Sequence, residues 1–256
     1  MNVKRNPSPY DAPELYDRLF ETFDFDLAYW LDVARKAKGP ILEIGCGTGR
    51  VLLPIRREGL DIDGLDLSRA MIARLRRKAA DEKLSVRAEV ADMRDFAMGR
   101  RYARIFCAFN GFAHCDTTED QIRVLKCCRA HLKPDGAVII HMSYPGPGYW
   151  AEPDGPPVLE QEAKKPGGDR IQLWDRRKKD AVRQRQESEL EIRDYSARNG
   201  STAVHKFSTS QRWVYRFELE LLFRAAGYAR WDVLGGFDGR PLRSADEQMI
   251  AWGYKS

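Results

Sequence analysis

Apolar residues at the start of the chain switch from helical spacing to a short continuous run. Leucine and aromatic side chains recur at threes and fours over residues 13–38, which predicts one N-terminal helix. The run ILEI at 41–44 is too short for a helix and is followed by a glycine-rich turn. It therefore predicts a buried parallel strand.

The same alternation of strand and helix continues through residue 144. Strands are expected at 62–66, 85–90, 103–109 and 137–142, and helices at 51–58, 68–82 and 118–132. Ser68 is a suitable N-cap for the second of these helices. This order of elements predicts βαβ units and a mostly parallel sheet covered on both faces.

The pattern changes after Tyr144. Proline and glycine crowd residues 145–157, period-2 patterns follow, and Asn199-Gly200 is a hairpin signal, so an antiparallel insertion is expected over 145–215. In a strand over 181–195 the odd positions from 183 to 193 are charged, and Val182, Leu190 and Ile192 would face inward. A helix at 216–226 and strands at 228–234 and 249–255 then resume the α/β pattern.

These patterns divide one domain into four parts. We expect an N-terminal helical cap at 1–38, a core at 39–144, the insertion at 145–215 as a lid or a dimer surface, and a C-terminal helix with the last strands at 216–256.

Composition narrows the class of protein. With 256 residues, 43% hydrophobic and 32% charged, the chain has the make-up of an ordered globular protein. No apolar run reaches the ~20 residues of a membrane span, and the N-terminus lacks the apolar core of a secretory signal. The five cysteines show neither a CxxC pair nor zinc-like spacing. We therefore expect a cytoplasmic protein with reduced thiols and no metal site.

The net charge of +5 is concentrated in one block. Residues 164–185 hold nine Lys/Arg against three Asp/Glu, a net of +6, so the rest of the chain nets −1. Such a block with Trp174 could contact RNA, but the alternating charges of 181–195 favour a solvated hairpin. Nucleic acid and membranes are therefore not expected as partners, and a homodimer through the insertion is left open.

The glycine loop after the first strand is the part of the sequence that indicates a ligand-binding site. Gly45, Gly47 and Gly49 precede a helix and would let the backbone approach a ligand closely. Asp66 ends the next strand, 21 positions after Gly45, where a carboxylate can accept both hydroxyls of a ribose. The pair predicts a cofactor that contains a nucleoside.

The loop departs from the dinucleotide fingerprint GxGxxG/A. Its third glycine comes one position early, and Arg50 occupies the next position. Glu43 lies in the strand before the loop, where a negative charge suits a cationic ligand better than a pyrophosphate. These features favour S-adenosylmethionine over NAD, and structural glycines with no ligand are the third alternative.

Three segments in order, ILEIGCGTGR, GLDLSRAMI and VADMRDF, resemble the motifs of class I S-adenosylmethionine-dependent methyltransferases of the small-molecule N-/O-methyltransferase group. The resemblance covers roughly residues 10–144 and the tail. It implies a Rossmann-like, doubly wound, mostly parallel seven-stranded sheet with the antiparallel insertion after strand five.

The resemblance also assigns residues to the cofactor. Asp66 would hold the ribose, Asp92 the adenine amino group, and the loop backbone the methionine part. The full set of expected cofactor-binding residues is Tyr16, Glu43, Gly45, Cys46, Gly47, Gly49, Asp66, Leu67, Met71, Asp92, Met93, Phe109 and Asn110. Asp92 could instead pair with Arg94, the methionines could fill the core, and Tyr16 could pack between helices.

Candidates for the acceptor side lie after strands four and five. His114 and His141 are the candidate catalytic groups because histidine titrates in the range needed for proton transfer, and His114 and Tyr144 are candidate substrate contacts. Either histidine could instead be structural, His114 as a cap and His141 bonded to backbone. The turn Asn110-Gly111-Phe112-Ala113 lacks the two prolines of enzymes that methylate nucleic-acid base amines.

The sequence thus favours methyl transfer to a small-molecule acceptor, nitrogen rather than oxygen, because no strong dedicated base is evident. Two alternatives are an RNA or protein methyltransferase that docks through 164–185, and a non-catalytic module that only binds the cofactor.

Overall fold

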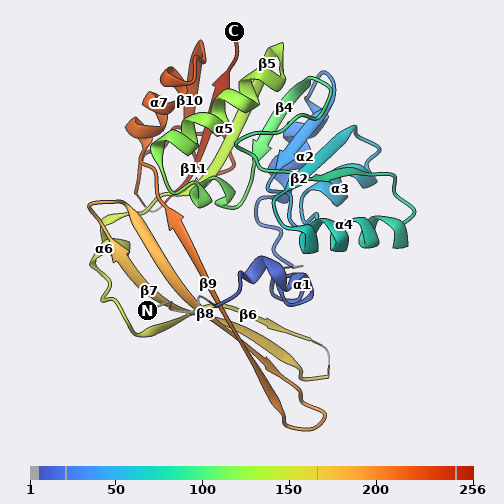
Figure 1. Cartoon of the computed structure of the whole chain (residues 1–256), viewed down its shortest axis with the longest axis vertical. Coiled ribbons are helices and arrows are strands. Elements are labelled where there is room, and N and C mark those ends of the chain that lie inside the picture. The colour runs from blue at the N-terminus through green and yellow to red at the C-terminus, as the bar shows by residue number, and fades with distance from the viewer. Residues whose placement is uncertain (1–5, 21, 166, 246) are drawn as a thin grey trace.

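Two β-sheets organise the chain, a larger mostly parallel one and a smaller antiparallel one (Figure 1). The computed structural model describes residues 6–20, 22–165, 167–245 and 247–256. The larger sheet has seven strands in the order β10-β11-β5-β4-β1-β2-β3, and only β11 runs antiparallel to its neighbours. The doubly wound α/β fold expected from the sequence is confirmed.

The strands of the larger sheet match the apolar runs. They are β1 (Ile41–Ile44), β2 (Ile62–Asp66), β3 (Arg87–Val90), β4 (Tyr102–Cys107), β5 (Leu132–Ser143), β10 (Arg230–Gly235) and β11 (Gln248–Tyr254).

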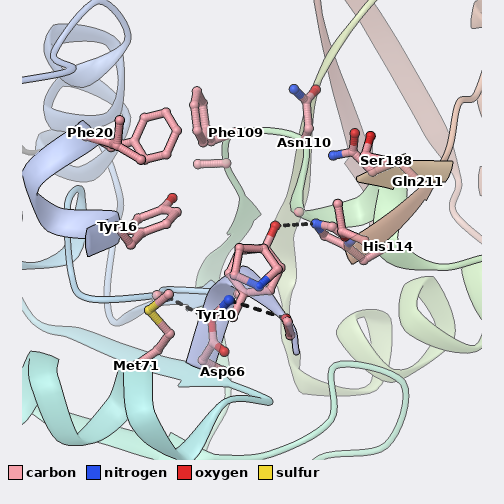
Figure 2. A pocket seen from close by; sticks show the side chains of 18 of the residues that line it. Tyr10, Tyr16, Phe20, Asp66, Met71, Phe109, Asn110, His114, Ser188 and Gln211 are labelled. Carbon is pink, nitrogen blue, oxygen red and sulfur yellow. Dashed lines mark hydrogen bonds between the residues drawn. The ribbon is translucent and has the colours of Figure 1, made fainter. Parts of the chain in front are cut away.

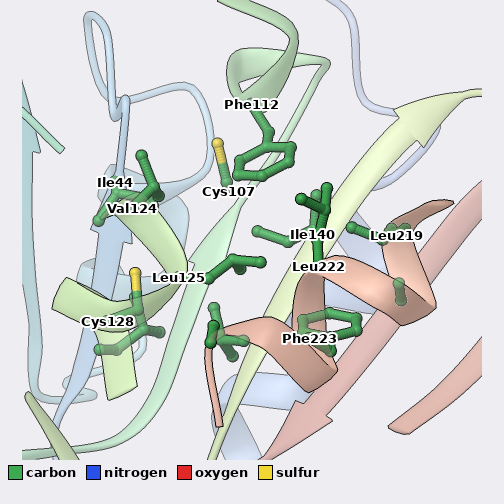
Figure 3. Packing of buried hydrophobic residues seen from close by; sticks show 14 of the residues in the cluster. Ile44, Cys107, Phe112, Val124, Leu125, Cys128, Ile140, Leu219, Leu222 and Phe223 are labelled. Atoms are coloured by element: carbon green, nitrogen blue, oxygen red, sulfur yellow. The ribbon is translucent and has the colours of Figure 1, made fainter. Parts of the chain in front are cut away.

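Helices cover both faces of this sheet. On one face α5 (Thr118–His131) and α7 (Arg216–Ala225) bury an apolar cluster against β4 and β5 (Figure 3). On the other, α2 (Leu27–Arg35), α3 (Leu52–Arg57) and α4 (Arg69–Asp81) pack on β1 and β2. Both faces are thus buried, which explains why the central strands read as continuous apolar runs.

The smaller sheet is the antiparallel insertion. Its strands pair in sequence order as β6 (Pro157–Lys164), β7 (Arg170–Asp180), β8 (Arg185–Tyr195) and β9 (Thr202–Arg212), preceded by the short helix α6 (Pro147–Ala151). The sheet lies beyond the end of the larger sheet, and α1 (Pro13–Phe20) lies between them (Figure 1). Leu19 of α1 packs on Ile171, Ile192 and Phe207.

The N-terminal segment differs from the expected single helix over 13–38. It forms two helices, α1 and α2, because the chain turns before Asp26, whose buried carboxylate accepts hydrogen bonds from Arg50 and from the indole of Trp30. Arg50 also donates to the carbonyl of Phe23 at 2.8 Å. A continuous helix would have taken that carbonyl into its own ladder.

Two strand boundaries also differ. β5 begins at Leu132, so Pro134-Asp135-Gly136 lies inside an irregular first part of the strand and not in a turn before it. β8 begins at Arg185, because residues 181–184 make the turn from β7. Val182, expected to face inward, is 95% exposed in that turn, whereas Ile192 is buried as expected.

Gly64 in β2 is required by packing alone. A Cβ there would lie 2.5 Å from the Leu52 side chain and 2.8 Å from the Cys46 sulfur. Helix α3 and the glycine loop therefore sit on β2 at a distance that only glycine permits.

No helix among the described residues is long and apolar enough to cross a membrane.

The ion pair of Asp26 and Arg50 ties the N-terminal cap to the core. Asp26 is fully buried and Arg50 nearly so, with Nη2 2.8 Å from the Asp26 Oδ2. Burial acts to raise the pKa of Asp26, but the hydrogen bonds and charge of Arg50 outweigh it and hold that pKa below its usual value.

Replacing Asp26 should therefore destabilise the fold strongly. Asp26→Ala leaves the Arg50 charge buried without its partner, so we expect the free energy of unfolding to fall by about 3–5 kcal/mol in urea titrations. Asp32→Ala is the matched control, since it removes an exposed pair with Lys36 and should cost less than about 1 kcal/mol. Equal losses in the two variants would contradict the proposed role of the buried pair.

Candidate functional site

A cavity of about 1030 Å³ opens between the carboxyl ends of the parallel strands, the N-terminal cap and the inner face of the antiparallel sheet. It is at the upper end of the size range of small-molecule sites, so it offers room for a cofactor beside an acceptor. Figure 2 shows the side chains that meet in it from these three parts of the chain.

The glycine loop supplies bare backbone to this cavity. Gly45 and Gly47 line it in left-handed conformations, with φ of 70° and 53°, and nothing lies within 4 Å of where a Cβ would project. Gly49 has a different role, because a Cβ there would lie 2.9 Å from Leu53 and 3.1 Å from Leu75. Two of the glycines thus face the cavity and the third serves packing.

Asp66 presents a fixed carboxylate beside the loop. Its Oδ2 accepts from the backbone N–H of Gly47 at 2.9 Å and its Oδ1 from that of Ser68 at 2.8 Å. Burial raises the pKa of Asp66, and these two hydrogen bonds act against that rise. Each oxygen keeps a lone pair, so the carboxylate can accept two neighbouring hydroxyls.

Four further residues expected from the sequence surround this end of the cavity. Leu67, Met71, Asp92 and Met93 all line it. Asp92 is held by Arg94 through its guanidinium and its backbone N–H, and Arg94 also pairs with Asp120 at 2.8 Å. The hydrogen bond from Arg94 holds the pKa of Asp92 below its usual value. The ion-pair alternative for Asp92 is therefore present, and the residue still faces the cavity.

Three of the expected cofactor-binding residues do not reach the surface of the cavity. Glu43, Cys46 and Gly49 are not among the described residues that line the cavity. Glu43 is buried with its Oε2 lacking a hydrogen-bond partner, and burial raises its pKa well above the usual range. A raised pKa favours the neutral acid, and a neutral Glu43 would not attract a cationic ligand as the sequence suggested.

His114 lies in the cavity with an unexpected partner. Its Nε2 is 2.7 Å from the Tyr10 hydroxyl, and its Nδ1 is 3.1 Å from the carbonyl oxygen of Ser210 (Figure 2). The carbonyl can only accept, so Nδ1 carries the proton and Nε2 accepts from Tyr10. Burial lowers the pKa of His114 below its usual value. The imidazole is thus held neutral, with its lone pair directed at the tyrosine.

Tyr10 was missed by sequence reasoning because it precedes the first periodic segment. Its carbonyl accepts from the Ser68 hydroxyl at 2.8 Å, which fixes the N-terminal segment to the start of α4. Figure 2 shows its ring between Asp66 and His114.

His141, the other candidate catalytic group, also lines the cavity. It is buried, its Nδ1 accepts from the backbone N–H of Phe109 at 3.0 Å, and its Nε2 lies 3.0 Å from the Gln248 side-chain oxygen. With Nε2 donating, both ring nitrogens are engaged. This matches the alternative in which His141 is bonded to backbone.

The backbone that His141 holds is strained. Phe109 and Asn110 adopt left-handed conformations, with φ of 51° and 61°, which residues other than glycine rarely take. The side-chain oxygen of Asn110 accepts from the N–H of Ser143 at 2.6 Å. Phe109 and Asn110 both line the cavity.

Aromatic residues of the N-terminal cap cover the cavity. Tyr16 lines it, together with Phe20, Phe23 and Phe25. Phe20 and Phe23 both pack edge-on against Phe109, with centroids 5.5 and 5.6 Å apart. The sequence pattern placed these phenylalanines in a continuous helix, so their role in covering the cavity could not be read from it.

The antiparallel sheet lines the cavity opposite the glycine loop. Its inner face contributes Asp175, Gln186, Ser188 and Gln211. Gln186 and Ser188 alternate with charged residues in β8 and occupy the inward face that would ordinarily be apolar. Polar residues at these inward positions were the signal in the sequence that this face of the sheet lines a site.

Tyr144, a candidate substrate contact, lines a second cavity of about 360 Å³ next to the first.

No group of three or more His, Cys, Asp or Glu side chains suited to a metal ion occurs in the described part of the chain.

The chain's residues fit an S-adenosyl cofactor. Bare backbone at Gly45 and Gly47, the fixed carboxylate of Asp66, and apolar Leu67, Met71 and Met93 lie around one end of the cavity. These are the groups that a methionine tail, a ribose and a purine ring need.

Comparison with known proteins agrees with this chemistry. Residues 41–136 match the family model of a methyltransferase domain. The chain is 27% identical over 203 residues to dTDP-3-amino-3,6-dideoxy-alpha-D-glucopyranose N,N-dimethyltransferase of Streptomyces fradiae, covering 79% of this chain and 74% of the relative. It is 25% identical to cypemycin N-terminal methyltransferase of a Streptomyces species, covering 96% and 97%.

A solved structure shares the fold over nearly the whole chain. An S-adenosylmethionine-dependent methyltransferase from Clostridium acetobutylicum superposes with a TM-score of 0.76 at 15% identity, covering 94% of this chain and 96% of that one. Residues 41–136 thus form a methyltransferase domain, and the chain is an S-adenosylmethionine-dependent methyltransferase.

Proposed function

We propose that the protein transfers a methyl group from S-adenosylmethionine to an amine nitrogen of a small molecule. The observation that carries this proposal is the Tyr10–His114 pair, which lies in the cavity beside Asp66. Relatives named as an amino-sugar N,N-dimethyltransferase and as an N-terminal methyltransferase support the choice of nitrogen.

The cofactor would lie along the glycine loop. Gly45 and Gly47 would contact its methionine part, Asp66 would accept from both ribose hydroxyls, and Met71 and Met93 would border the adenine. When bound, the cofactor supplies an electrophilic methyl group on a sulfonium. The protein then has to hold the acceptor in line with that methyl and exclude water.

The Tyr10–His114 pair suits an amine acceptor. An ammonium must lose one proton before its nitrogen can attack, and a neutral imidazole can take it up. The proton would pass from the ammonium to the Tyr10 oxygen while the Tyr10 hydroxyl gives its own proton to Nε2 of His114. Because burial lowers the pKa of His114, the ring is a weak base and does not suit an alcohol acceptor.

Docking of nucleic acid through residues 164–185 receives less support. Arg177 pairs with Asp175 and Glu160, Arg183 with Asp180, and Lys179 donates to two backbone carbonyls. Several basic side chains of the block are thus already engaged by other groups of this chain, whereas phosphate binding needs available cations. A homodimer through this sheet stays a prediction.

We also infer a cytoplasmic location, which the five free cysteines support because disulfides are rare in that compartment.

The proposed activity can be tested directly. The purified chain, incubated with radiolabelled S-adenosylmethionine and a panel of amino sugars and short peptides, should transfer label to amine nitrogen. Label found only on oxygen would contradict the proposal. Binding of the cofactor without transfer to any acceptor in the panel or in a cell extract would favour the non-catalytic alternative.

Asp66 should contribute most to cofactor affinity. We expect Asp66→Ala to weaken binding of S-adenosylhomocysteine at least tenfold in calorimetry, because two charge-assisted hydrogen bonds of roughly 1.5–3 kcal/mol each are lost. Asp92→Ala should cost less, since Arg94 already engages that carboxylate. Exposed Asp61→Ala is the control and should leave affinity unchanged. Unchanged affinity in Asp66→Ala would remove Asp66 from the site.

Tyr10 should act on turnover and not on cofactor affinity. We expect Tyr10→Phe to lower kcat at least tenfold, because the proton path to His114 is interrupted. The dissociation constant of S-adenosylhomocysteine should stay within twofold. Tyr254→Phe, at the far end of β11, is the control and should leave both quantities unchanged. A normal kcat in Tyr10→Phe would exclude the proton path.

A further inference from the structure

The two cavities meet at a polar neck between the strained turn and the antiparallel sheet. The residues that line both cavities are Asn110, Ser143, Glu160, Asp175, Gln186 and Gln211. The neck lies on the acceptor side, away from the glycine loop, so its chemistry bears on the part of the acceptor remote from the reacting nitrogen. This inference rests on the proposed function.

Asp175 in β7 is the most unusual group in the neck. It is 4% exposed, and its Oδ2 accepts from Arg177 at 3.0 Å, from Ser188 at 3.1 Å and from Gln186 at 3.2 Å. Its Oδ1 is buried and has no hydrogen-bond partner. A buried carboxylate oxygen without a donor is costly, so an additional hydrogen-bond donor at Asp175 would be stabilising.

The cationic side chains that line the two cavities are already neutralised. Among the described residues, these are Arg94 and Arg177, together with the two histidines. Arg94 pairs with Asp92 and Asp120, and Arg177 pairs with Asp175, Glu160 and Glu152. Burial lowers the pKa of both His114 and His141, which favours their neutral forms.

The carboxylates outnumber these cations. Asp24, Asp66, Asp92, Glu160 and Asp175 all line the larger cavity. Burial raises the pKa of Asp66, Glu160 and Asp175, whereas the hydrogen bond from Arg94 lowers that of Asp92. A diphosphate is bound by unpaired arginines, lysines or ordered backbone N–H groups, and it is repelled by carboxylates at short range. An ammonium or a hydroxyl, in contrast, is a hydrogen-bond donor of the kind that Asp175 lacks at Oδ1.

We infer that the acceptor is a phosphate-free amine carrying a second hydrogen-bond donor, an ammonium or a hydroxyl, that binds Asp175 in the neck. The Streptomyces fradiae relative is named for a dTDP-linked sugar, so this chain would differ from it in substrate class. Asp175 would then be a specificity-determining residue of the acceptor site.

Binding to the unmutated chain tests the substrate class. The protein loaded with S-adenosylhomocysteine is titrated by calorimetry with 2-deoxystreptamine, glucosamine, 1,3-diaminopropane and dTDP-3-amino-3,6-dideoxyglucose. We expect at least one phosphate-free probe to bind tenfold or more tightly than the dTDP-linked sugar. Equal or tighter binding of the dTDP-linked sugar overturns the inference, and so does an absence of binding by all phosphate-free probes at millimolar concentration.

The same titrations distinguish the two donor groups. If the diamines bind best and their affinity falls with added salt, the donor that meets Asp175 is an ammonium. If glucosamine binds best and salt has little effect, it is a hydroxyl. Either result supports a phosphate-free acceptor that carries a second hydrogen-bond donor.

Asp175→Asn tests the contact itself. The change keeps the shape but removes the charge, so we expect the best probe to bind at least tenfold more weakly, with the affinity for S-adenosylhomocysteine unchanged as a check on folding. Glu189→Gln is the matched control, because Glu189 lies exposed in β8 on the outer face of the same sheet. Unchanged probe affinity in Asp175→Asn excludes Asp175 as the contact.

Failure of this inference can be told from failure of the proposed function. A chain that methylates the amine of the dTDP-linked sugar keeps the proposed function and loses the inference. A chain that binds S-adenosylhomocysteine but methylates no amine loses the proposed function.

Discussion

The buried pair of Arg50 and Asp26 is the constraint on which the site depends. Arg50 follows the glycine loop directly, and its guanidinium reaches the Asp26 carboxylate, the Phe23 carbonyl and the face of the Phe109 ring. One side chain thus fixes the break between α1 and α2, the aromatic cover and the strained turn relative to the loop. The cavity exists because these three parts are held together by a charge that cannot be left unpaired.

The features that were predicted correctly from the sequence are those that depend on local residue patterns. The strands ILEI and IDGLD, the glycine loop and the position of Asp66 all lie where periodicity and spacing put them. What it missed depends on contacts between distant segments. The break before Asp26 is set by Arg50, and Tyr10 reaches His114 from 104 positions away, across a stretch with no periodic signal. Glu43 was expected at the cavity, but whether a strand residue faces a ligand or the packed side of a loop is decided in three dimensions.

Desolvation sets the charge state of the acceptor side. The two histidines are held toward their neutral forms, and the guanidiniums of Arg94 and Arg177 are each surrounded by carboxylates. A site with neutral proton acceptors and satisfied cations presents mainly hydrogen-bond acceptors to its ligand. This is the opposite of the potential found at phosphate-binding loops, where unpaired N–H groups point toward the anion.

The tight packing at Gly49 and Gly64 has a consequence for how this kind of sequence signature is interpreted. Both glycines are excluded from carrying a side chain by neighbouring Leu53, Leu75, Leu52 and Cys46, whether or not a ligand is bound. A homologue that no longer used its nucleoside would therefore still need them, and a motif search would still find it. Gly45 and Gly47 meet open space, but their positive φ values favour glycine with or without a ligand. The side chain of Asp66 is under no comparable constraint of backbone conformation, so loss of the ligand would first leave a trace there.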